Sequence, residues 1–176
     1  MMPQDGKIIC NTGDAAGADA LFAGFATNAG HKVVRWSPYF NPEALKQADQ
    51  FVFRANTTLK RTFPSASEHT NNLLRRNYWQ VRDTKAVFAV ARLSDRGIKG
   101  GTAWAVQMAI DLRVPTVYLF DMNANMWNQW YYSMWKWDYV LSREMHKPSH
   151  FIVYTGIGSR VITQKAINAI GELYAK

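Results

Sequence analysis

Residues 7–19 read KIICNTGDAAGAD, a short apolar run followed by a glycine-containing turn and the start of a helix rich in small residues. Two later stretches repeat this arrangement, KGGT at 99–102 and TGIGSR at 155–160. Each follows a plausible strand and opens a plausible helix. Three such turns predict several helix N-termini, with unpaired N–H donors and positive dipole ends, at one edge of a sheet. An edge of this kind is a natural site for an anion, most often the phosphate of a nucleotide.

Strand and helix patterns alternate along the rest of the chain. The continuous apolar run at 86–91 is typical of a strand in the middle of a parallel sheet. We therefore expect an α/β fold, a Rossmann-like three-layer sandwich with a mostly parallel sheet. Strands are expected at 7–12, 32–36, 86–91, 115–121 and 151–155, and loops at 57–67, 92–100 and 142–150. Helices are expected from the loop at 13–15 to about Ala29 (closed by Gly30), at 43–56 and 68–81, after an N-cap at Thr102, and after an N-cap at Thr163.

The composition is that of a globular protein, so residues 1–176 are expected to form one domain. Lys and Arg outnumber Asp and Glu by 21 to 13, which gives a formal net charge of +8. This positive charge either only keeps the protein soluble, or it attracts the phosphate groups of mononucleotides or nucleic acid. Cys10 is the single cysteine, so no internal disulfide forms. No signal-peptide pattern or membrane-spanning apolar run is present, and we expect a cytoplasmic protein with no membrane partner.

An aromatic segment at 127–141 reads WNQWYYSMWKWDYVL. It fits neither the helical nor the strand period, and we interpret it as a β-hairpin with its turn near Ser133 and Met134. Its Trp and Tyr side chains either pack on the protein's own sheet, form a subunit interface, or stack on single-stranded bases. A homo-oligomer is expected on the second interpretation.

The three glycine turns supply the candidate ligand-binding residues. Asp14 and Asp19 flank the first helix start, where they either complement the helix dipole or accept a hydrogen bond from a sugar hydroxyl. Arg160 adds a planar guanidinium that can hold a phosphate in bidentate fashion. The predicted phosphate-binding residues are Gly13, Gly17, Gly100, Gly101, Thr102, Gly156, Gly158, Ser159 and Arg160, with Asp19 on the sugar.

A basic stretch on the helix at 68–81 is open to two interpretations. Arg75, Arg76 and Asn77 lie on this helix, with Lys60, Arg61 and Arg82 near in sequence. They form either a solvated basic face or ligand contacts. The histidines show no H-E-x-x-H spacing, and no metal site is predicted. No resident cofactor is expected, although Mg²⁺ can accompany a phosphate ligand.

Together these motifs resemble the SLOG superfamily, which unites DNA-processing protein A, the Lonely Guy phosphoribohydrolases and many bacterial and phage proteins. The turn TGDAAGAD at 12–19 is similar to the family's S-G-G-A-x-G-A-D turn, and IKGGTAWA at 98–105 to its second glycine turn. YTGIGSR at 154–160 resembles the first-strand turn of phage-borne members. The set of His69, Arg76, Asn77, Gln80 and Val81 resembles a helix that those members carry, which favours Arg76 and Asn77 as ligand contacts.

The resemblance implies that the chain binds a nucleotide or nucleotide-derived small molecule. It would act either as a sensor or sponge for that molecule, or as an enzyme that cleaves the N-glycosidic bond of a nucleoside 5′-monophosphate. Asp19 and Asp14 are the candidate catalytic residues for that cleavage. At the position that corresponds most nearly to the Glu of the Lonely Guy enzymes, this chain has Gln107, which cannot act as an acid or base. The alternative is a single-stranded DNA-binding protein resembling DNA-processing protein A. The T-G-I-G-S-R unit normally comes first but here comes last, so it is either permuted in place or docked on another subunit.

Overall fold

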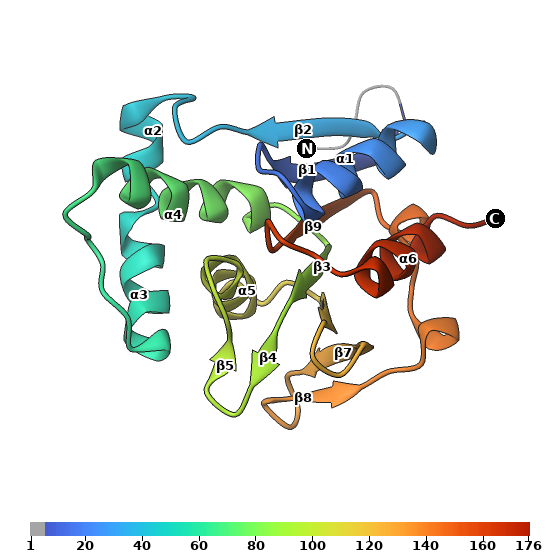
Figure 1. Ribbon diagram of the computed structural model, residues 1–176. Coiled ribbons are helices and arrows are strands. Elements are labelled where there is room, and N and C mark those ends of the chain that lie inside the picture. The colour runs from blue at the N-terminus through green and yellow to red at the C-terminus, as the bar shows by residue number, and fades with distance from the viewer. Residues whose placement is uncertain (1–5) are drawn as a thin grey trace.

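A computed structural model describes residues 6–176 as an α/β protein built on one seven-stranded sheet (Figure 1). The strand order is β2-β1-β9-β3-β6-β7-β8. The first five of these strands pair in parallel, and β7 and β8 add an antiparallel edge. The strands are β1 (Ile9–Gly13), β2 (Lys32–Trp36), β3 (Ala86–Ala91), β6 (Thr116–Asp121), β7 (Met126–Tyr131), β8 (Lys136–Tyr139) and β9 (Val153–Gly158). The predicted α/β fold with a mostly parallel sheet is confirmed.

Helices cover both faces of the sheet and complete the three layers (Figure 1). One face carries α3 (Asp49–Leu59), α4 (Glu68–Val81) and α5 (Thr102–Asp111), and the other carries α1 (Ala18–Asn28) and α6 (Gln164–Leu173). The short helix α2 (Pro42–Lys46) precedes α3. Every residue of β3 is buried, because helices cover both of its faces.

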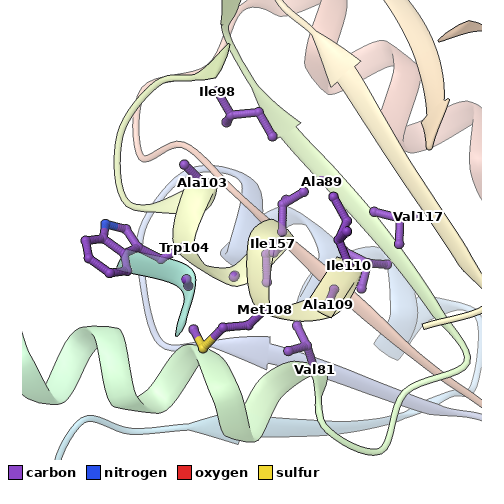
Figure 2. Packing of buried hydrophobic residues seen from close by; sticks show 14 of the residues in the cluster. Val81, Ala89, Ile98, Ala103, Trp104, Met108, Ala109, Ile110, Val117 and Ile157 are labelled. Atoms are coloured by element: carbon purple, nitrogen blue, oxygen red, sulfur yellow. The ribbon is translucent and has the colours of Figure 1, made fainter. Parts of the chain in front are cut away.

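The core of the first face is centred on α5. Figure 2 shows Met108, Ala109 and Ile110 of this helix beside Val117 of β6 and Ile157 of β9. Seven of the ten residues of α5 are buried, because the helix is apolar on most sides. The start of α5 is therefore held firmly against the carboxyl ends of the central strands.

The aromatic segment forms the predicted hairpin, with β7 and β8 joined by residues 132–135. The turn lies where the sequence placed it, since Tyr131 pairs with Lys136. Trp127 is buried against Phe88 and Phe120, whereas Trp135 is 53% exposed. The hairpin thus packs partly on its own sheet and leaves some aromatic surface outside.

Several predicted element boundaries were wrong. The region 43–56 is two helices, because tight 3₁₀-type bonds from Gln47 N–H to the Ala44 oxygen and from Ala48 N–H to the Leu45 oxygen end α2 before α3 begins. The last strand runs on to Gly158, since both of its neighbours pair with it. Two short strands, β4 (Leu93–Ser94) and β5 (Gly97–Ile98), form a hairpin in the expected loop 92–100, and two 3₁₀ turns lie within 142–150.

The last strand–helix unit sits inside the sheet of its own chain. β9 lies between β1 and β3, and its register pairs Cys10 with Tyr154 and Phe88 with Gly156. This unit therefore occupies the centre of the sheet, although it comes last in the sequence.

Candidate functional site

The three glycine turns meet at the carboxyl ends of β1, β9 and β3. From β1 the chain crosses by way of α1 to β2 on one side, and from β3 it crosses by way of α5 to β6 on the other. The two crossover helices lie on opposite faces of the sheet. Ligands of open α/β sheets bind in the crevice at such a change of direction.

A cavity of about 400 Å³ occupies this crevice. Its volume lies in the range of small-molecule sites. The lining comes from four segments: the α1 start, one face of α4, the turn before α5 and the turn after β9. The lining residues are Ala15, Asp19, Leu73, Arg76, Asn77, Gln80, Gly100, Gly101, Thr102, Ala105, Ile157, Gly158, Ser159, Arg160 and Val161.

The α5 start carries free backbone donors, and Gly100, Gly101 and Thr102 at this start line the cavity. The N–H groups of Gly101, Thr102 and Ala103 have no hydrogen-bond partner among residues 6–176. Gly100 has a φ of +77°, a conformation that favours glycine. Gly101 differs, because its φ is −67° and a Cβ there would meet nothing within 4 Å. The N-cap of α5 is Gly101, and the predicted N-cap Thr102 is instead the first helical residue.

Arg76 is the most unusual side chain of the site. It is 8% exposed, yet none of its nitrogens has a hydrogen-bond acceptor within reach, and no carboxylate oxygen within residues 6–176 lies within 4.0 Å of it. Burial lowers the pKa of Arg76, while Asp19 raises it. A buried charge is costly unless it is paired, so this guanidinium has an unused capacity for an anion.

The neighbouring Arg75 shows the contrast. Its Nε lies 2.6 Å from Asp49 Oδ1, and its Nη1 lies 2.6 Å from Glu68 Oε1. Arg75 is therefore committed to ion pairs within the α3–α4 layer. Of the two adjacent arginines, Arg75 is therefore paired within the protein and Arg76 lines the cavity. The amino-acid composition alone does not show this difference.

Asp19 is the one acidic side chain in the lining. Its Oδ1 accepts a hydrogen bond from the Gly158 N–H at 3.0 Å. Burial raises the pKa of Asp19 to about 6, against the opposing effects of the Arg76 guanidinium, the N–H groups of Gly158 and Gly13, and Arg160. The carboxyl group fixes the β9 turn against the start of α1.

Gln80 lies one turn beyond Arg76 on α4 and is 1% exposed. Neither Nε2 nor Oε1 of its amide has a hydrogen-bond partner within the described part of the chain. A Cβ on Gly13 would collide with Asp19 and press on Gln80 and Arg76. Gly13 thus makes room for three polar side chains to converge beneath the cavity.

Nine of the twelve predicted ligand residues line the cavity, and three lie beside it. Gly13 faces the polar cluster just described. Gly17 has a φ of +82°, and a Cβ there would strike the backbone oxygens of Ser159 and Arg160. Gly156 lies against the Phe22 ring. These glycines allow close packing of the turns. The second catalytic candidate, Asp14, is exposed and outside the lining.

Two polar residues, one in the lining and one behind the α5 turn, were not among the predicted ligand residues. Gln80 stands at i+4 from Arg76, so helical spacing alone places it on the same face. Arg61 donates from Nη1 to the Gly100 oxygen at 2.6 Å and from Nη2 to the Ile98 oxygen at 2.8 Å. It is 39 residues from Gly100 in sequence, and no local pattern indicates this contact. Gln107 is engaged with Asp111 and does not line the cavity.

No family model, curated protein or solved structure matches this chain. Within residues 6–176, no group of three or more His, Cys, Asp or Glu side chains is placed to hold a metal ion. No helix in the same range is long and apolar enough to cross a membrane.

Proposed function

We propose that this chain binds the phosphate of a nucleotide or nucleotide-derived small molecule in the cavity between α4, α5 and the β9 turn. The observation that carries the proposal is the buried Arg76 guanidinium, which has no hydrogen-bond or ion-pair partner within residues 6–176. An anion that enters the cavity would pair with this guanidinium, since an unpaired buried cation otherwise lowers the free energy of unfolding.

The surroundings favour phosphate over other anions. Free N–H groups at the start of a ten-residue helix supply several donors to one group, and the helix dipole adds attraction. Arg160 supplies a second cation in the lining, so Arg76 and Arg160 outweigh Asp19 there. A nucleotide would place its phosphate at the α5 start and its sugar toward Asp19.

Binding, as by a sensor or a sponge, is the form of the proposal that we favour over cleavage. N-glycosidic hydrolysis would need an acid or base beside the sugar, and Asp19 is the one candidate in the lining. Its carboxylate already accepts the Gly158 N–H. If cleavage occurs, Asp19 would stabilise the developing positive charge of the sugar.

A thermal-shift panel tests this proposal. Nucleoside 5′-monophosphates, cyclic nucleotides, ADP-ribose and inorganic phosphate are compared with adenosine, which lacks the phosphate. A ligand at 100 times its Kd adds about 2.7 kcal/mol. For a chain of this size that corresponds to a rise in Tm of roughly 5–10 °C. Gly101→Glu, which places a carboxylate at the α5 start, should abolish the shift.

Two other outcomes decide against the proposal. Equal shifts with adenosine would show that phosphate is not recognised. Oligonucleotide binding with a steep salt dependence, and no response to mononucleotides, would favour the single-stranded DNA alternative, with Trp135 and Tyr139 of the hairpin as the exposed aromatics. Mass spectrometry of the small molecules that co-purify with the protein would identify the ligand.

A further inference from the structure

The backbone turn before α5 is held from outside the cavity by one side chain. Arg61 follows α3 and does not line the cavity. Its guanidinium spans two carbonyl groups of the turn, those of Ile98 and Gly100, at 2.8 Å and 2.6 Å. The two bonds come from different terminal nitrogens, so the planar group fixes both carbonyls at once.

This contact determines where the next N–H group points. A trans peptide unit is planar, with its carbonyl oxygen and the following N–H on opposite sides. Because Arg61 holds the Gly100 oxygen, the Gly101 N–H is directed away from Arg61, and Gly101 lines the cavity whereas Arg61 does not. The Ile98–Lys99 peptide is held at both ends, since Arg61 donates to the Ile98 oxygen at 2.8 Å and the Lys99 N–H donates to the Arg92 oxygen at 2.9 Å.

Two adjacent glycines would otherwise leave this peptide unit free to rotate. Gly100 adopts a φ of +77°, and neither glycine would have a Cβ contact within 4 Å. Within residues 6–176, no side chain therefore packs where a Cβ of either glycine would lie. The hydrogen bonds from Arg61 restrain the turn at the Ile98 and Gly100 oxygens.

We propose that Arg61 is a positioning residue of the phosphate site, which orients the Gly101 N–H for an incoming phosphate without touching it. This inference rests on the proposed function. A lysine at 61 would keep the charge but present a single ammonium group, which cannot hold two carbonyls in the same fork geometry. If Arg61 acts by orienting the turn, Arg61→Lys should weaken phosphate binding. If Arg61 acts only through its positive charge, Arg61→Lys should leave phosphate binding unchanged.

Isothermal titration calorimetry with inorganic phosphate separates the two effects. We expect Arg61→Lys to weaken phosphate binding about 10-fold or more, the loss that accompanies one misdirected hydrogen bond to a charged group. Arg54→Met on α3 is the control, since it removes one exposed positive charge without touching the turn. It should change the affinity less than about twofold at physiological salt.

Amide NMR provides a readout that a general loss of stability would not produce. In the wild-type protein the Gly101 amide resonance should shift on phosphate addition, and in Arg61→Lys that shift should shrink while the rest of the spectrum stays folded. Wild-type affinity and an unchanged Gly101 response in Arg61→Lys would overturn the inference and leave the proposed function standing. Absence of phosphate binding to the wild-type protein would overturn both.

Discussion

Replacing Arg76 with Met should separate binding from folding. The substitution removes a buried guanidinium that lacks a protein partner and fills its place with an apolar chain of similar length. Exchanging a buried ion pair for well-packed apolar groups is often neutral or stabilising by about 1–4 kcal/mol, and we expect the same sign for a buried cation without an ion-pair partner within residues 6–176. Loss of the attraction to Asp19 is partly offset, because the pKa of Asp19, which burial already raises and Arg76 lowers, rises further without Arg76.

The same substitution should nearly abolish phosphate binding. A guanidinium that donates two hydrogen bonds to a phosphate contributes about 1.5–3 kcal/mol for each bond. Loss of about 3 kcal/mol or more corresponds to at least a roughly 100-fold weaker affinity. Urea unfolding in the absence of ligand measures the stability, and isothermal titration calorimetry with inorganic phosphate measures the affinity.

Arg75→Met is the matched control, since it removes a neighbouring buried arginine from the same helix. Its ion pairs to Asp49 and Glu68 would be lost, and we expect a decrease in stability of about 1–2 kcal/mol with unchanged phosphate affinity. An Arg76→Met protein that loses about 2 kcal/mol of stability but binds phosphate like the wild type would falsify this reasoning. Arg76 would then be a structural residue.

Three further predictions concern the same edge of the sheet. Gly101→Glu should fold with a stability within about 0.5 kcal/mol of wild type, because its φ is −67° and space is open there, and calorimetry should detect no phosphate binding; retained binding would remove this turn from the site. Gly156→Ala should destabilise the protein by about 1–3 kcal/mol in urea unfolding, because its Cβ would overlap the Phe22 ring, and a neutral effect would contradict the close packing of β9 on α1. The pKa of Asp19 is raised in the folded state to about 6 from ~3.9 when unfolded, so the stability should fall by about 2 kcal/mol as pH rises from 4 to 6, and Asp19→Asn should remove this slope; a variant with the wild-type slope would assign it to another group.

The sequence predicted the layers of the fold because periodicity is a local property. The helix 68–81 and the strands 32–36 and 86–91 have the expected bounds, since apolar spacing and turn residues define them. Apolar spacing and turn residues did not predict that 43–56 forms two helices, because no glycine or proline lies between Ala44 and Ala48. The position of β9 between β1 and β3 is a tertiary property that strand patterns alone do not encode.

The sequence predicted the part of the candidate site that consists of backbone N–H groups, because glycine turns can be recognised in a sequence. Glycine turns indicate free N–H groups, and the turn at 99–102 does present them. The sequence could not distinguish glycines that face the cavity, such as Gly101, from those that allow close packing, such as Gly17 and Gly156. It also could not show that Arg75 is paired and Arg76 is not, because this difference depends on carboxylates of other segments.

A crystal structure of the protein soaked with a nucleoside 5′-monophosphate tests the central claim most directly. We expect the phosphate within hydrogen-bond distance of the Arg76 guanidinium and of the N–H groups that begin α5. A phosphate bound elsewhere, or an Arg76 side chain that stays unpaired at saturating nucleotide, would contradict the assignment of this cavity as the phosphate site.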